Sequence, residues 1–260
     1  MRLFDSHAHI DDRCYEKDFA RMMKRADEHS VKGIMAVGID MKTSRRAIEL
    51  AEKHDHIIAS VGVHPHDAEN CSDETIEELV RMARTHSRVR AWGETGLDFN
   101  RMYAPVADQE MCFEKQLHAA QQANLPMIFH ERDSNGRLLE ILRSGKPVER
   151  RAVVHCFSGT REEMFAYLDM GFFIGITGIL TIKKRGVYLR ELAVDIPEDR
   201  ILIETDAPYL TPAPQKNKHR RNEPAFVRSV LLKLAEIRDR DPEELSEAIW
   251  HNTERLFGKL

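Results

Sequence analysis

The amino-acid sequence predicts an α/β protein of the (β/α)8 barrel class. Eight short apolar runs alternate with segments of helical periodicity, which is typical of parallel strands joined by helical crossovers. The chain has 260 residues, close to the roughly 250 residues typical of such a barrel. We therefore expect residues 1–260 to form a single domain. A doubly wound open sheet is the alternative. Such a sheet would place its ligand at one switch point and would not gather residues from six strand ends.

The predicted strands are short runs of apolar residues, and several are bounded by glycine, proline or polar residues. The first ends at Leu3 and Phe4, Gly33 precedes the second, and Pro65 prevents the third from continuing in a hydrogen-bonded ladder. After the first strand, we expect the others at residues 34–37, 57–63, 89–92, 126–129, 152–154, 172–176 and 201–203.

Helices are predicted where apolar residues recur at helical spacing between these strands. Phe19, Met22 and Ala26 show this spacing in the first helix. The sequence predicts helices at residues 15–29, 43–54, 73–86, 108–123, around 138–142 and at 161–170. A short helix then leads to the last strand, and two more close the chain at about residues 223–237 and 242–256.

Composition limits the classes of function. The net charge is −4, whereas a protein that coats long nucleic acid is usually basic, so any contact with nucleic acid should be local. The four cysteines are scattered without a Cys-x-x-Cys pair, which favours a reduced, cytoplasmic protein. No stretch approaches the ~20 apolar residues that span a membrane. We expect a cytoplasmic monomer without a membrane association or an obligate protein partner.

The residues that suggest chemistry begin at the amino terminus. His7 and His9 follow an apolar pair, and in an extended backbone side chains at i and i+2 point to the same side. Both imidazoles can therefore reach one cation. By itself His-x-His is a weak signal, because two partly buried histidines bonded to backbone carbonyls explain it equally well.

The same arrangement recurs along the chain, because a polar residue follows six of the predicted strands. These residues are His7, His9, His64, Glu94, His130, His155 and Asp206. In a barrel the carboxyl ends of the strands meet on the face that carries the active site. Each residue has a structural alternative, such as a helix cap for Glu94 or a turn cap for Asp206. Those alternatives do not explain why every one stands at a strand end.

This set of side chains predicts a two-metal hydrolytic site. Four histidines and two carboxylates are more than one ion needs. They suit two divalent ions, Mg²⁺, Mn²⁺ or Zn²⁺, roughly 3.5–4 Å apart and bridged by a carboxylate and a hydroxide. Asp206 is the predicted general base. Asp98 and Glu204 are predicted to fix imidazoles or a loop, and His66 is expected outside the metal site.

At this point the sequence resembles the TatD family of metal-dependent DNases. Seven motifs in the family's order, covering nearly the whole chain, carry the resemblance: DSHAH at 5–9, GVHPH at 62–66, GETGLDF at 93–99, HERD at 130–133, HCFSG at 155–159, ETDAPYL at 204–210 and RNEP at 221–224.

The resemblance implies a TIM-barrel metallo-hydrolase of the amidohydrolase superfamily. It implies that the first ion is held by His7, His9, Glu94 and Asp206, and the second by Glu94, His130 and His155. It also implies 3′-to-5′ exonucleolytic hydrolysis of DNA, often with magnesium. Some related proteins act on aminoacyl-tRNA esters instead, so the resemblance leaves the substrate open.

Three functions therefore compete. The first is a deoxyribonuclease acting at the 3′ ends of DNA, with His64, Arg132 and Arg221 as predicted substrate contacts. For Arg221 the alternative is a salt bridge that holds the turn at residues 222–224. The second is a metal-dependent esterase or amidase acting on aminoacyl-tRNA or a small molecule. The third is a non-enzymatic metal-binding scaffold. The residues argue against it, because a complete ligand set with a base is more than a scaffold needs.

Overall fold

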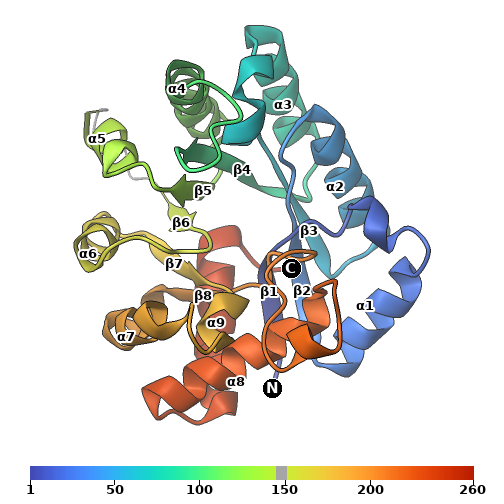
Figure 1. Ribbon diagram of the computed structural model, residues 1–260. Coiled ribbons are helices and arrows are strands. Elements are labelled where there is room, and N and C mark those ends of the chain that lie inside the picture. The colour runs from blue at the N-terminus through green and yellow to red at the C-terminus, as the bar shows by residue number, and fades with distance from the viewer. Residues whose placement is uncertain (145–150) are drawn as a thin grey trace.

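A computed structural model describes residues 1–144 and 151–260 of the chain and confirms the barrel. Eight parallel strands follow one another in sequence order around a nearly closed barrel, which excludes the doubly wound alternative (Figure 1). Between the last and first strands, the Asp206 amide donates to the His7 carbonyl at 2.9 Å. The strands are β1 (Leu3–Ala8), β2 (Val31–Ala36), β3 (Ile57–Val61), β4 (Val89–Asp98), β5 (Met127–Arg132), β6 (Ala152–Val154), β7 (Phe173–Ile176) and β8 (Ile201–Ile203).

Most of the helices surround the strands, and the last helix lies behind the strands near the centre of the view (Figure 1). The helices are α1 (Phe19–Glu28), α2 (Met41–Lys53), α3 (Asp73–Thr85), α4 (Val106–Ala123), α5 (Arg137–Ser144), α6 (Arg161–Asp169), α7 (Val187–Asp195), α8 (Val227–Arg238) and α9 (Pro242–Phe257). No helix within the described ranges combines the length and the apolar character that crossing a bilayer requires.

The main differences from the predicted boundaries have local causes. The helix expected from residue 15 begins at Phe19, because Arg13–Tyr15 form a separate 3-10 turn capped by the Asp12 side chain. The helix expected from residue 223 begins at Val227, because Pro224–Phe226 form another such turn. Three strands extend beyond their predicted ends, so that His7, Glu94 and His130 lie inside the last part of a strand.

The inside of the barrel is filled by one apolar side chain from every strand. This layer consists of Phe4, Met35, Ile58, Ala91, Ile128, Val153, Phe173 and Leu202. Trp250, Leu256 and Phe257 of α9 pack against it, and the Phe4 and Trp250 ring centroids are 5.7 Å apart. The intervening strand residues face the helices and join the larger outer core. The layer gives the carboxyl ends of the strands a rigid base.

Candidate functional site

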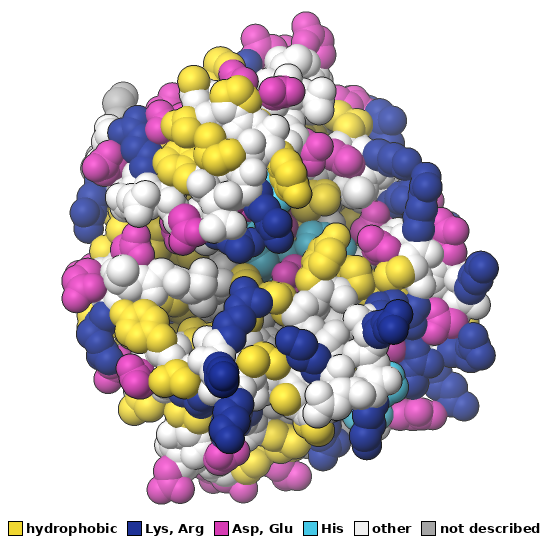
Figure 2. Space-filling model, in the orientation of Figure 1, with side chains coloured by type: hydrophobic (Ala, Val, Ile, Leu, Met, Phe, Trp, Pro, Cys, Tyr) yellow, Lys and Arg dark blue, Asp and Glu magenta, His cyan; other side chains and the backbone are white. Residues whose placement is uncertain are grey.

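The residues predicted to carry the chemistry meet at the carboxyl ends of the strands. They line a cavity of about 560 Å³ that includes His9, His64, Glu94, His130, His155 and Asp206. His7 lies beneath this surface and is fully buried. Figure 2 shows histidine side chains at the base of a hollow near the middle of this face, with basic and hydrophobic side chains around it.

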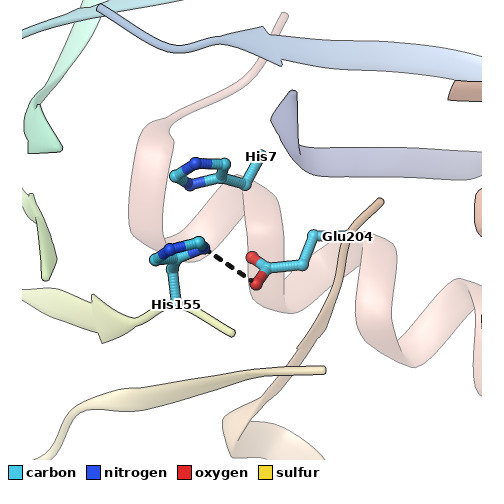
Figure 3. Close-up of side chains that lie close together, drawn as sticks. All are labelled: His7, His155 and Glu204. Atoms are coloured by element: carbon cyan, nitrogen blue, oxygen red, sulfur yellow. Dashed lines mark ion pairs between the residues drawn. The ribbon is translucent and has the colours of Figure 1, made fainter. Parts of the chain in front are cut away.

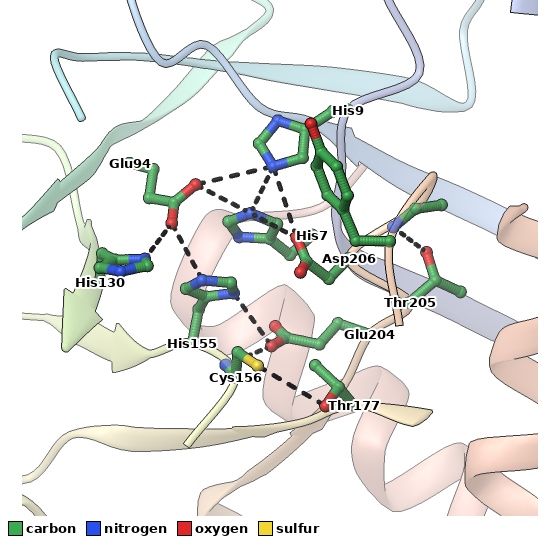
Figure 4. Close-up of polar contacts among 12 residues, drawn as sticks. His7, His9, Glu94, His130, His155, Cys156, Thr177, Glu204, Thr205 and Asp206 are labelled. Carbon is green, nitrogen blue, oxygen red and sulfur yellow. Dashed lines mark hydrogen bonds and ion pairs between the residues drawn. The ribbon is translucent and has the colours of Figure 1, made fainter. Parts of the chain in front are cut away.

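Glu94 is the centre of the arrangement, because its two carboxylate oxygens face different groups of imidazoles (Figure 4). Its Oε2 atom lies 3.2 Å from His7 Nε2 and 3.7 Å from His9 Nε2. Its Oε1 atom lies 2.7 Å from His130 Nδ1 and 3.0 Å from His155 Nε2. One carboxylate therefore joins two neighbouring groups of potential metal ligands.

Strand β5 approaches β4 closely at the residue that precedes Glu94. Gly93, which precedes it, has φ +139°, and a Cβ atom there would lie 2.5 Å from the Ile128 carbonyl oxygen. Only glycine allows β4 and β5 to come this close with that backbone conformation. The glycine therefore helps to place Glu94 over the middle of the barrel.

The first group contains His7, His9 and Asp206 beside Oε2 of Glu94. The Nε2 atoms of the two histidines are 3.3 Å apart, so the two imidazoles do meet as the His-x-His spacing predicts. Asp206 Oδ1 lies 3.4 Å from His9 Nε2 and 3.8 Å from His7 Nε2. Two nitrogens and two carboxylate oxygens thus converge on one small volume.

The second group contains His130 and His155 beside Oε1 of Glu94, and the structure adds His64 to it. His64 Nε2 lies 3.4 Å from that oxygen and 3.3 Å from His130 Nδ1. The residue predicted as a substrate contact therefore lies among the potential ligands at the cavity wall. The His7 and His155 rings stack at 3.8 Å and link the two groups.

Asp98 and Glu204, which were predicted to fix imidazoles or a loop, each lie beside an imidazole of the second group. Asp98 Oδ2 is 3.3 Å from His130 Nε2, on the side of the ring away from Glu94, and 2.7 Å from His66 Nε2. Glu204 Oε1 is 3.3 Å from His155 Nδ1, as Figure 3 shows together with His7. Each carboxylate thereby holds the far nitrogen of an imidazole and turns its near nitrogen toward Glu94.

The electrostatics favour cations at this site. Burial would raise the pKa of Glu94, but the surrounding imidazoles, first that of His155, hold this pKa well below its usual value. Burial would lower the pKa of His155, but the charge of Glu94 and the nearby carboxylate of Glu204 hold it well above normal. Asp206 also has a lowered pKa, since contacts with His9 and His155 outweigh its burial. The carboxylates thus stay ionised and attract positive charge.

These residues fit divalent metal ions. Three groups of nitrogen and oxygen atoms each lie within 4.8 Å of one another: His7 with His9 and Glu94, His64 with Glu94 and His130, and His7 with His155 and Glu204. Within the described ranges, Nδ1 of His7 is buried and has no hydrogen-bond partner. Buried imidazoles beside ionised carboxylates are the ligand set of divalent metal sites in hydrolases.

Two residues in the motifs serve the site by holding the loop that carries Asp206. Asp5 accepts hydrogen bonds from the Thr205 amide at 2.8 Å and hydroxyl at 2.6 Å. The Asn222 amide group donates to the carbonyls of Thr205 at 2.9 Å and Tyr209 at 2.6 Å. These supporting roles were not predicted, although both residues stand in the quoted motifs.

Of the two arginines predicted to contact substrate, the structure brings only Arg132 into the cavity. Arg221 instead forms a bidentate ion pair with Asp18, with both distances 2.8 Å, and lies 4.5 Å above the Tyr15 ring. Hydrogen bonds from Arg221 and Arg25 lower the pKa of Asp18 to about 2. This geometry matches the salt-bridge alternative for Arg221, and its phosphate contact stays a prediction.

The other residues that line the cavity include Arg101, Tyr103, Arg185 and Tyr209, which are not among the predicted substrate contacts. The sequence signal for Arg185 is its run with two lysines, and Tyr209 lies in a quoted motif. Arg101 and Tyr103 lie in the irregular segment between β4 and α4, where no periodicity points to them.

Comparisons with known proteins identify the family of this chain. The family model of TatD-related DNases matches residues 4–258. A curated relative from Citrobacter rodentium, named 3′-5′ ssDNA/RNA exonuclease TatD, is 40% identical over 98% of each chain. A relative of the same name from Pantoea ananatis is 39% identical over 99% of this chain and 100% of its own. The crystal structure of a TatD homologue from Escherichia coli superposes with a TM-score of 0.92 at 29% identity, covering 100% of this chain and 99% of that one.

Proposed function

The chain belongs to the TatD-related DNase family of metal-dependent hydrolases, and on this premise we propose that it removes nucleotides from the 3′ end of single-stranded DNA. One observation above all supports the proposal. Glu94 presents its two oxygens to two groups of ligands inside a cavity that arginines also line. Hydrolysis of a phosphodiester needs this combination of a metal pair and cations for the phosphate oxygens.

We propose which residues hold the two ions. His7, His9 and Asp206 would hold the first together with Oε2 of Glu94, and His130 and His155 would hold the second together with Oε1. When bound, divalent ions polarise the phosphoryl group and lower the pKa of a water molecule. His64 borders the second group and is the proposed contact to a phosphate oxygen.

The chain's own residues then complete the reaction. Asp206, which its lowered pKa keeps ionised, accepts the proton of the attacking water. Water oxygen bonds to phosphorus as the bond from phosphorus to the 3′ oxygen of the preceding nucleotide breaks. The departing 3′ oxygen takes up the proton that Asp206 received, so the products are a nucleoside 5′-monophosphate and a strand shortened by one nucleotide with a free 3′-hydroxyl. Arg132 would neutralise a phosphate oxygen in the bound strand.

A substrate panel tests this function. Single-stranded DNA labelled at the 5′ end should be shortened stepwise with Mg²⁺, Mn²⁺ or Zn²⁺, and DNA labelled at the 3′ end should release a labelled mononucleotide at once. Duplex DNA, RNA, aminoacyl-tRNA and simple esters complete the panel. Hydrolysis of an ester or aminoacyl-tRNA without any cleavage of DNA would replace the nuclease by the esterase alternative.

We expect Arg132→Ala to weaken binding of single-stranded DNA and to make that binding less dependent on salt. Each neutralised phosphate contributes roughly 0.7 to the slope of log affinity against log salt for a single strand. Titrations of a labelled strand at several salt concentrations should show this decrease with unchanged metal content. An unaltered slope would exclude Arg132 as a phosphate contact.

Arg221→Ala is the matched arginine control. Because it removes the ion pair with Asp18 and the contact with the Tyr15 ring, we expect the free energy of unfolding to fall by about 1–2 kcal/mol. Denaturant unfolding measures this effect. If Arg221→Ala also lowers the salt slope, the predicted phosphate contact of Arg221 is correct as well.

We further propose that residues 1–260 act as one domain and as a monomer in the cytoplasm. In support of this, the described strands form one continuous barrel, and all four cysteines are free, as in a reducing compartment. Light scattering of the purified protein would determine its molecular mass in solution.

A further inference from the structure

Two tyrosines at the mouth of the cavity are far more exposed than the other aromatic residues around the site. Tyr103 follows β4 and is 65% exposed, and Tyr209 follows β8 and is 56% exposed. Both line the cavity that contains the potential metal ligands. Large rings that are mostly open to solvent contribute little to the core, and these two lie at the mouth of the cavity, where a ligand could contact them.

Each ring packs against a histidine that lies beside a different one of the two ligand groups around Glu94. The Tyr103 ring contacts the His66 ring edge-on, with centroids 4.7 Å apart. His66 Nε2 in turn lies 2.7 Å from Asp98 Oδ2. Tyr209 lies against the His9 ring at 5.9 Å, on the side of the first ligand group. A scissile phosphate held beside Glu94 would therefore have one aromatic ring near each ligand group.

Cationic side chains share this cavity with the tyrosines. Arg101, Arg132 and Arg185 line it and come from the segments after β4, from β5 itself and from the segment after β7. Figure 2 shows basic and hydrophobic side chains next to one another around the central hollow. Aromatic rings alternating with cations are typical of surfaces that bind single strands, where bases stack on the rings and phosphates meet the cations.

We propose that Tyr103 and Tyr209 form a two-base subsite for the 3′ end of a single strand. One ring stacks on the base of the departing nucleotide, and the other stacks on the base of the nucleotide that precedes it. Both bases must be unpaired to reach the rings, so the subsite selects frayed or single-stranded ends over blunt duplexes. The inference rests on the proposed nuclease function and specifies how the site selects its substrate.

The test compares two oligonucleotides of equal length and equal phosphate number. One has natural bases throughout, and the other has abasic sites at its last two positions. Stacking contributes about 1–3 kcal/mol per base, so for two bases the parent protein should prefer the natural strand in kcat/KM by about thirtyfold or more. Tyr103→Leu and Tyr209→Leu should each reduce this preference, and the double variant should remove most of it.

Conservative variants and a surface control separate stacking from other effects. Tyr103→Phe and Tyr209→Phe keep the ring and should keep the preference. Phe165→Leu, at an exposed aromatic residue of α6, should behave like the parent. Metal content should be the same in all of these proteins, because the residues proposed to hold the ions are histidines, Glu94 and Asp206, and none of them is changed.

The outcomes distinguish this inference from the proposed function. If the parent cleaves DNA but the leucine variants keep its full preference for the natural strand, the two-base subsite is wrong and the nuclease function stands. If kcat/KM of the leucine variants falls by the same factor on both strands, the tyrosines have only a structural role, and the subsite is equally wrong. If the parent cleaves neither strand and hydrolyses an ester, the proposed function itself fails.

Discussion

Glu94→Ala is expected to abolish binding of both divalent ions and to reduce hydrolysis to the background rate. Its two oxygens lie between two groups of imidazoles, so its removal deprives both ion positions of a charged ligand at once. His7→Ala should weaken mainly one position, because the His7 imidazole faces Oε2 of Glu94. Elemental analysis after equilibration with Mn²⁺ or Zn²⁺, followed by desalting, measures both effects.

The matched control for this experiment is Glu49→Ala. Glu49 lies on α2 with a side chain that is 65% exposed, and among the described residues it forms an ion pair with Lys53, so its loss should leave metal content and activity unchanged. Circular dichroism checks that Glu94→Ala remains folded. Two ions at normal occupancy in Glu94→Ala would show that this carboxylate does not bridge them.

Asp206→Asn is expected to lower kcat by roughly 10²-fold or more, the typical contribution of a general base. The amide keeps an oxygen near His9 but cannot accept the proton of the attacking water. The fold should persist, because Asp206 lies at the mouth of the barrel with a side chain that is 14% exposed. Single-turnover cleavage of a labelled strand at saturating metal measures the rate.

Asp169→Asn, at an exposed position at the end of α6, serves as the control for the same chemical change. It should cleave DNA at the parental rate. If Asp206→Asn also cleaves near the parental rate when metal is saturating, another group must accept the proton, and Asp206 is only a ligand candidate.

The alternation of apolar runs and helical segments was sufficient to predict the barrel. The structure reproduces the predicted bounds of β6 and β8, Ala152–Val154 and Ile201–Ile203. The reason is local, since each short run is buried from end to end. The six predicted metal ligands also come together, because the strand order of a barrel alone brings the carboxyl ends of its strands onto one face.

The residues that the sequence did not reveal act through contacts between distant parts of the chain. Asp5 holds Thr205, and Tyr15 donates a hydrogen bond to the Asn222 carbonyl. Such pairs join segments that only the closed barrel brings together, and no periodicity in either segment indicates these contacts. For Arg221 the sequence suggested a salt bridge as one alternative, but its partner Asp18, at the start of α1, could not be predicted.

The central claim is that Glu94 organises two adjacent ion positions, and anomalous diffraction from crystals containing Mn²⁺ tests it most directly. We predict two peaks roughly 3.5–4 Å apart, one bounded by His7, His9 and Asp206 and the other by His130 and His155, with Glu94 between them. A single peak, or two peaks that do not share Glu94, would contradict the account.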